Sequence, residues 1–514
     1  MRQLVFLAIL ALCLPLSLPA QNTWERTFGP AVQRMTVSDA WELPDGSWGV
    51  AMVSVGAQLN PWSMTVINSW LALLDPTGET TLLEALDVGD DQSLAINDLE
   101  ILDNGDILAI GATWEQNPVG NSKVAIHRFS QASGNSVMTL SPLPGDTLQF
   151  IGTISTLDDE GDLFILGVAQ RTGTAFPNYL SLLRAQPDGL ILADTIMQHG
   201  GALGLGHHAL KGSDGLWRVS MDGNLPGGPF GFSSIHLFTP ELHHEGGLAF
   251  TSLSGSGQPS PLDSIMRDGL YMSALAGDTL IVSGRFGLFT NGTRAALVRL
   301  APDGTYAGMF LPRSTYPNDY IGLIQGHDIT PENQVVFATV ENFDPMNTYV
   351  GTIPSRIHIY RLDTLLNPEC EYIVDGFDGN VCYYLNRIKA TRDGGFLLMG
   401  SRRDLNTMEQ PRAWIMKVDG SQCSPMGLTE ETRPDPTMVY PNPGRDGFTL
   451  VLNGTHRGNM RLELYDAMGQ LAIARPITQS MEFIDTEQLP PGMYLYRVSA
   501  AGGALIGGGR WVKQ

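Results

Sequence analysis

Histidines gather in one part of this sequence, where they could hold a metal ion. Six of the ten lie between positions 199 and 244, and they include two adjacent pairs, the second followed by a glutamate. Imidazole and carboxylate groups bind zinc and similar ions. Adjacent side chains on one strand point to opposite faces, so a pair cannot easily share an ion, and ordinary polar roles are the competing explanation. The candidate metal ligands are His207, His208, His243, His244 and Glu245.

Other catalytic chemistry leaves no recognisable pattern in the chain. No nucleophile elbow, glycine-rich phosphate loop or EF-hand loop occurs. Acidic residues stand in nearly every turn, so the carboxylate pair of a glycoside hydrolase cannot be selected from the sequence. We therefore assign no catalytic residue and expect no cofactor.

Three cysteines remain once Cys13, which lies in an N-terminal leader, is set aside. Exported proteins commonly carry disulfides. A bridge between Cys370 and Cys382 would close a short loop and contribute roughly 3 kcal/mol by the loop-entropy estimate. We predict this bridge and a free Cys423, although pairing with Cys423 remains open. A zinc site is disfavoured because no CxxC or HxxxH spacing accompanies the cysteines.

Residues 1–20 are predicted to be a secretory signal peptide. Arg2 supplies the positive start, residues 4–12 form an apolar core, and a small residue precedes Gln21. No later run approaches the ~18 to 20 apolar residues that span a bilayer. The net charge of −22 and the pI near 4.7 disfavour nucleic acid as a partner.

The elements that must position any site are predicted from an internal repeat. Seven copies of a hairpin turn recur 54 to 62 positions apart, each followed by an apolar run and a later strand. The turn residues are Gly46, Gly105, Gly161, Gly215, Gly277, Asn333 and Gly394. A unit of roughly 58 residues with about four strands cannot bury both faces of its own sheet, so it must stack on similar neighbours. Residues 21–420 are therefore predicted to form a seven-bladed β-propeller. The alternatives are a series of sandwiches, which would need linkers, and a β-helix, whose coils are shorter.

The two ends of the repeat region complement each other. The segment Trp24–Phe28 is a strand without a blade, and the last repeat lacks its fourth strand after residue 420. We predict that Trp24–Phe28 pairs beside residues 413–418 and closes the ring, which removes an exposed sheet edge.

Parts of the repeat region resemble those of exported Bacteroidetes-type proteins. In that family a W-x-x-T-F-G strand precedes a T-x-D-G-G-[FY]-L-x-x-G-S hairpin and a D-x-W-I-x-K-x-D strand. Residues 391–401 and 413–419 match the hairpin and the strand closely.

After a proline-containing linker at residues 421–437, short alternating strands predict a small immunoglobulin-like antiparallel β-sandwich over residues 438–514. This segment resembles the type A C-terminal sorting domain of type IX secretion cargo. The residues that carry the resemblance are Tyr440, Pro441, Asn442, Pro443, Asp466, Gly469, Gly492, Tyr494 and Lys513. The resemblance implies export to the outer cell surface or the medium, an outer-membrane translocon as partner, and removal by a sortase-like peptidase. The alternative is a carbohydrate-binding or adhesive sandwich.

The propeller gives no function by its fold alone. We expect a monomeric binding or scaffold protein whose propeller contacts a surface glycan, a protein or a cation. The rival is a secreted hydrolase or lyase. Several acids, histidines or tyrosines converging in one pocket at the central face would favour the enzyme.

Overall fold

The computed structural model describes residues 23–514 apart from 31–32, 56–66, 90–91, 117–118, 143–146, 172–178, 198–204, 224–231, 249–266, 287–293, 313–318, 344–351, 408, 426–436, 453–459, 468, 480 and 501–504. The predicted signal peptide, residues 1–20, lies outside this part, as does most of the predicted linker. Among the described residues, no helix is long and apolar enough to cross a membrane.

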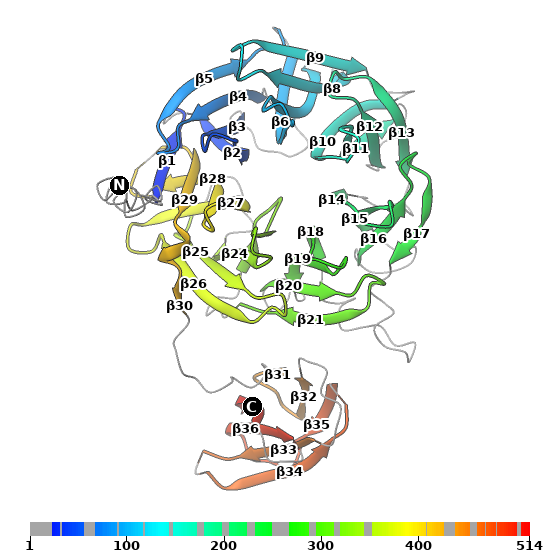
Figure 1. Ribbon diagram of the computed structural model, residues 1–514. Helices are drawn as coiled ribbons and strands as arrows, with labels where there is room; N and C mark the ends of the chain where they lie inside the picture. Colours follow the sequence, from blue (N-terminus) through cyan, green and yellow to red (C-terminus); the bar gives the residue numbers. More distant parts are fainter. Residues whose placement is uncertain are drawn as a thin grey trace, which may run out of the picture.

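Seven antiparallel sheets form a ring, which confirms the predicted propeller (Figure 1). In each blade the first strand lies at the axis and the last at the rim. The strands of blades one to four are β2 (Arg34–Glu42), β3 (Trp48–Val55), β4 (Ile67–Leu74) and β5 (Thr80–Leu86); β6 (Gln92–Ile101), β7 (Ile107–Gln116), β8 (Val119–Phe129) and β9 (Ser136–Pro142); β10 (Thr147–Leu157), β11 (Leu163–Arg171), β12 (Tyr179–Ala185) and β13 (Ile191–Met197); and β14 (Leu205–Lys211), β15 (Trp217–Gly223), β16 (Phe232–Phe238) and β17 (His244–Leu248).

Blade five follows the same plan, whereas blades six and seven depart from it. In blade six the inner strand is split into two short strands, and a fifth strand, β30, is added at the rim. In blade seven the outer strand comes from the N-terminus. The strands are β18 (Arg267–Ala274), β19 (Leu280–Phe286), β20 (Arg294–Leu300) and β21 (Tyr306–Phe310); β22 (Asp319–Ile321), β23 (His327–Ile329), β24 (Val335–Glu341), β25 (Arg356–Leu362), β26 (Pro368–Asp375) and β30 (Ser424–Pro425); and β27 (Val381–Ala390), β28 (Phe396–Asp404), β29 (Arg412–Val418) and β1 (Trp24–Phe28).

The alternation of side chains along each central strand explains why the blades stack. In β7, Leu108 and Ile110 pack on blade three, whereas Ile107 and Ala109 pack on blade one. Successive residues of a strand point to opposite faces, so one apolar strand serves two interfaces. Each buried aliphatic side chain contributes roughly 1.5–3 kcal/mol.

Hairpin turns between the first two strands of several blades are stabilised by acidic residues. In blade seven, the Asp393 carboxylate accepts the backbone N–H of Gly395 at 3.1 Å and pairs with the Lys417 ammonium at 2.8 Å. In blade two, Asp106 pairs with Arg128 at 2.6 Å. The turn residue Gly394 has a φ of 76°, a conformation that glycine adopts without strain. The abundant turn acids therefore stabilise hairpins.

The N-terminal strand closes the ring as predicted. β1 pairs antiparallel with β29, with Trp24 opposite Lys417 and Phe28 opposite Ala413. Trp24 and Phe28 are buried in the core shared by blades seven and one. The indole N–H of Trp414 also donates to Glu25 at 2.6 Å.

The predicted disulfide between Cys370 and Cys382 is wrong. Cys370 is bonded to Cys423, with 5.5 Å between their Cα atoms, and Cys382 is a buried free thiol. Although Cys382 is near Cys370 in sequence, the chain between them runs from the rim strand β26 to the axial strand β27. Cys423, in contrast, follows the short 3₁₀ helix η4 (Gly420–Gln422) and leads into β30, which pairs with β26. The bridge therefore fastens the end of the repeat region to the rim of blade six.

The C-terminal segment is a two-sheet sandwich. Its core contains Phe448, Leu450, Leu462, Leu464 and Trp511. One sheet has the order β31 (Thr437–Tyr440), β32 (Gly447–Leu452), β35 (Met481–Asp485); the other has the order β34 (Leu471–Ile477), β33 (Met460–Tyr465), β36 (Gly492–Ala500), β37 (Leu505–Lys513).

Deleting residues 22–29 should destabilise the propeller, because β29 becomes an exposed edge and the core loses Trp24 and Phe28. Losing one buried aromatic side chain typically costs about 3–5 kcal/mol. We expect a melting temperature many degrees lower in differential scanning calorimetry, whereas Glu25→Gln should change it little. An unchanged transition in the deletion variant would contradict closure by β1.

Peptide mapping without reduction should recover Cys370 joined to Cys423. The bridge spans a sequence separation of 53 residues, for which the loop-entropy estimate gives about 4 kcal/mol. Cys370→Ser and Cys423→Ser should therefore lower stability equally in denaturant titrations, and Cys382→Ser should leave the bridge intact. Recovery of a peptide joining Cys370 to Cys382 would refute the assignment.

Candidate functional site at the propeller axis

The inner strands share one irregularity close to the axis. In six blades a register shift interrupts the pairing of the inner strand with its neighbour, and in blade six the inner strand is split. The residue at this position stands seven places before a turn residue with positive φ. In blade five that turn residue is Asp278, which directly follows the predicted turn residue Gly277, and both have positive φ. The residues at this axial position are Asp39, Asp98, Ile154, His208, Tyr271, Gly326 and Arg387.

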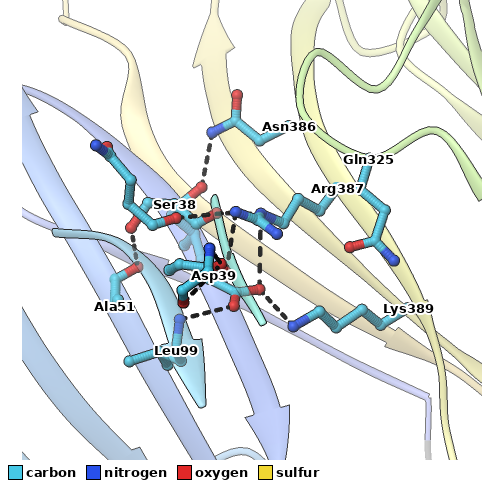
Figure 2. A network of polar contacts seen from close by, with 12 residues as sticks. Ser38, Asp39, Ala51, Leu99, Gln325, Asn386, Arg387 and Lys389 are labelled. Atoms are coloured by element: carbon cyan, nitrogen blue, oxygen red, sulfur yellow. Dashed lines mark hydrogen bonds and ion pairs between the residues drawn. The ribbon is translucent and has the colours of Figure 1, made fainter. Parts of the chain in front are cut away.

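Arg387, which belongs to blade seven, contacts residues of blades one and two (Figure 2). From blade seven, its Nε donates to the carbonyl of Ser38 at 2.9 Å in blade one. Its Nη2 donates to the carbonyl of Asn97 at 3.0 Å and lies 3.1 Å from Oδ1 of Asp98, both in blade two. The guanidinium is buried, and its forked set of N–H groups allows it to contact all of these acceptors at once.

Asp39 is the second centre of the network. Its Oδ1 lies 2.7 Å from the Lys389 ammonium, and its Oδ2 accepts the backbone N–H of Leu99 at 3.0 Å (Figure 2). Asp98 repeats the second contact one blade further on, where its Oδ2 accepts the backbone N–H of Ser155 at 2.5 Å. Each carboxylate therefore reaches into the next blade around the ring.

The two carboxyl groups differ in protonation. Burial raises the pKa of Asp98 to about 7, opposed by Arg387 and assisted by the nearby charge of Asp39. Burial also acts to raise the pKa of Asp39, but Arg387 and Lys389 outweigh it and hold that pKa below its ordinary value. One carboxylate is thus kept ionised while its neighbour holds a proton up to near neutral pH.

The opposite side of the axis is aromatic. The rings of His208 and Tyr271 have centroids 3.9 Å apart, and Tyr271 meets His327 edge-on at 5.2 Å. Burial lowers the pKa of His327 to about 3, and a backbone hydrogen bond with Ile281 opposes this shift. Burial likewise lowers the pKa of His208 well below its usual range. Both imidazoles are therefore neutral at pH 7.

A recess with a volume of about 100 Å³ opens beside the charged side of the axis. Asp328 lines it and accepts the backbone N–H groups of Ala390 and Ile329 at 2.9 and 2.8 Å. Burial raises the pKa of Asp328 to about 6. The other lining residues are Ala40, Trp41, Glu42, Trp48, Lys389, Ala390, Thr391, Arg392 and Leu397.

The two predicted histidine pairs are not brought together. His208 lies at the axis on β14, whereas His243, His244 and Glu245 are exposed at the rim, at or just before the start of β17. Three strand spacings separate β14 from β17, which is about 14 Å. The side chain of His207 lies outside the described part. His244 instead meets His236, at 3.0 Å between ring nitrogens.

One group of three potential ligands, Asp158, Glu160 and Asp162, occurs in the described residues. It surrounds the Arg184 guanidinium, which lies 3.3 Å from Asp158 and 2.8 Å from Asp162 and also pairs with Glu160. This cluster already has its cation in the form of an arginine.

The residues of the predicted sorting motif hold the sandwich together. Asn442 accepts the backbone N–H of Val512 and donates to the carbonyl of Arg510, each at 2.9 Å, and this clasps the Tyr440–Pro443 segment to the last strand. The ammonium of Lys513 is buried and donates to the carbonyls of Thr486 and Glu487.

The remaining motif residues shape turns of the sandwich. Asp466 accepts the backbone N–H of Gln470 at 2.8 Å, and Gly469 between them has a φ of 79°. Tyr494 donates its hydroxyl to the carbonyl of Pro490 at 2.7 Å. Gly492 begins β36.

The axial residues were not predicted as functional residues from the sequence. Asp39, Asp98 and Arg387 lie within strands, whereas the acids that stand out in the sequence lie in turns. The usable signal was their constant distance from the turn residue in repeats that otherwise share little sequence.

Comparisons with known proteins identify the C-terminal segment. Residues 438–507 match the family described as secretion system C-terminal sorting domain. Among curated proteins, none matches the chain.

Several solved structures are similar to this chain at low identity. A protein of unknown function from Dyadobacter fermentans is 10% identical, with 77% of this chain and 99% of that chain covered and a TM-score of 0.41. PorZ, a surface component of the type IX secretion system of Porphyromonas gingivalis, is 12% identical, with 91% and 69% covered and a TM-score of 0.28. An α-L-arabinanase from Penicillium chrysogenum is 12% identical, with 63% and 93% covered and a TM-score of 0.40. These similarities are too distant to carry an argument about activity.

The raised pKa of Asp98 predicts a pH-dependent effect of Asp98→Asn. Between pH 4 and 7 the folded protein holds a proton on Asp98 that the unfolded chain has released, so the stability of the wild type falls as pH rises through this window. The asparagine variant lacks this loss. The unfolding free energy of the wild type relative to Asp98→Asn should therefore fall with increasing pH, by at most about 1.4 kcal/mol per unit.

Urea titrations at pH 5, 6 and 7, followed by tryptophan fluorescence, measure this difference. Asp103→Asn, in the exposed turn of the same blade, is the matched control and should show a constant difference. A constant difference for Asp98→Asn as well would contradict the protonated state of Asp98.

Proposed function

We propose that this chain, a cargo of the type IX secretion system that reaches the outer cell surface or the medium through its C-terminal sorting domain, is a binding or scaffold protein whose propeller makes the functional contacts. The observation that carries the proposal is that the charged groups at the axis are buried and already paired. Asp39, Asp98, Arg387 and Lys389 are all buried and are engaged with one another or with backbone groups. Their evident role is to hold blades seven, one, two and three in register.

Exposure argues against catalysis by these groups. A general acid or base must reach the substrate directly or through one water, and the Asp39 side chain has an exposed fraction of 0%. Sites that enclose a whole small molecule usually have volumes of about 300–1,000 Å³, whereas the described recess has about 100 Å³, which is enough for only part of a ligand. Acids, histidines and a tyrosine do converge at the axis, but the side chains of Asp39, Asp98, His208 and His327 are buried.

One observation favours the alternative of a secreted hydrolase. Asp39 and Asp98 are neighbouring carboxyl groups whose pKa values are displaced in opposite directions, and pairs of this kind supply the base and the acid in many enzymes. Catalysis would require the blades to expose them.

The sorting domain implies contact with the secretion machinery. We assign recognition by the outer-membrane translocon and removal by a sortase-like peptidase to this domain. Surface glycan or protein ligands belong to the propeller, because its rigid ring can carry varied loops without disturbing the packing of the blades.

Incubation of the exported protein with insoluble polysaccharides and surface proteins from the producing cell tests the proposal. We expect retention on one of these ligands without the appearance of new reducing ends or peptide termini. A chain lacking residues 438–514 should bind equally well but fail to be exported.

The binding role would be contradicted by turnover of a ligand that is lost in a folded Asp39→Asn variant and retained in Asp103→Asn. Loss of ligand binding in the truncated chain would move the functional surface to the sandwich.

A further inference from the structure

The recess lies at one mouth of the axis, where β2 and β27 end beside β23. Trp41 stands at its edge with 37% of its surface exposed. All other tryptophan side chains in the described part of the chain are buried or half-buried. A large aromatic ring left open next to a polar recess is typical of surfaces that bind a partner.

Hydrogen-bond donors and acceptors surround this ring. The buried ammonium of Lys389 lies over one face of the Trp41 ring, 3.9 Å from its centroid, so a ligand would have to pack against the opposite face. The exposed Arg392 guanidinium, of which one N–H donates to the carbonyl of Leu43 at 3.2 Å, adds further donor groups, and Asp328 and Glu42 add acceptors. The hydroxyl of Thr391 is buried and donates to Asp393, so it is not available to a ligand.

The charges in the recess nearly balance. Lys389 is already paired with Asp39 at 2.7 Å. The backbone N–H of Arg392 donates to the Glu42 carboxylate at 2.9 Å, which holds the acidic Glu42 side chain at the rim beside Arg392. An anionic ligand would meet Asp328 and Glu42, and a cationic ligand would meet Lys389 and Arg392, so neither sign of charge is favoured.

We infer that the recess binds the terminal residue of a neutral saccharide, with Trp41 against the C–H face of the sugar ring and the surrounding donors and acceptors serving its hydroxyl groups. This inference rests on the proposed binding role and names its ligand class. Sugar hydroxyls both donate and accept hydrogen bonds, and the ring presents apolar C–H groups to an aromatic surface. The small size of the recess fits one end of a glycan chain, whereas a stable protein interface covers about 800 Å² on each partner.

Saturation-transfer difference NMR on the full exported chain tests the inference. The probes are the methyl glycosides of glucose, galactose, mannose and N-acetylglucosamine, and glucuronate is the charged comparison. We expect transfer to at least one neutral glycoside and a weaker response from glucuronate. Trp41→Ala should weaken binding at least tenfold, Trp41→Phe should retain part of it, and Arg392→Ala should weaken it severalfold.

Leu83→Ala is the matched control, because Leu83 is an exposed apolar residue on the rim strand of the same blade. It should leave binding unchanged. Should Trp41→Ala lose its thermal transition, Trp41→Phe and Arg392→Ala decide the question.

Each contrary outcome has a distinct meaning. Absence of transfer to all four neutral glycosides, or a stronger response from glucuronate, overturns the ligand class. Transfer that survives both Trp41→Ala and Arg392→Ala overturns the location while the binding role stands. Appearance of free sugar in the same spectra would overturn the binding role itself, and its dependence on Trp41 would still locate saccharide recognition at the recess.

Discussion

The ring depends on one constraint, which is that every blade has two apolar faces and no blade can cover both of its own. Six interfaces between consecutive blades bury most of these apolar faces. The seventh interface joins blades one and seven, which lie at opposite ends of the repeat region in sequence. The core that joins them contains Trp24 and Phe28 from the N-terminal strand, Val37 from β2, and Met399 and Ile415 from the last blade. Because β1 belongs to blade seven while the next residues begin blade one, a single short segment closes the sheet and the ring together. The disulfide between Cys370 and Cys423 fastens the other end of the repeat region to blade six.

Closure creates the polar axis as its consequence. Seven inner strands converge where side chains lose contact with water, and a charge buried there without a partner would be costly. The axial charges are concentrated on one side, where Arg387 and Lys389 keep Asp39 ionised and Asp98 holds a proton up to near neutral pH, and neutral rings such as His208 lie on the other side. Converging acids and histidines are therefore compatible with a structural role, and the exposed edge around Trp41 is the better place to look for ligands.

The sorting domain shows the same coupling of motif and fold. Asn442 and Lys513 are two of the residues that carry the resemblance to secretion signals. Their side chains form hydrogen bonds with backbone atoms of the sandwich. The signature residues of the sorting domain therefore stabilise its fold. The propeller can vary without altering the sorting domain, since its own core and its own closure are built from residues 24–425.

The number of blades, the place of the closing strand and the presence of the C-terminal sandwich can be predicted from the amino-acid sequence, because local patterns encode them. Turn residues such as Gly394 recur with the period of the blade, and Trp24–Phe28 is left over at one end while a strand is missing at the other. The disulfide pairing could not be predicted from the sequence. Cys370 and Cys382 are close along the chain, but one lies on a rim strand and the other on an axial strand. Only the tertiary structure decided this pairing, the axial cluster and the recess. Asp39, Asp98 and Arg387 come from three blades and look unremarkable in their own strands, and their charge states arise only from shared burial around one axis.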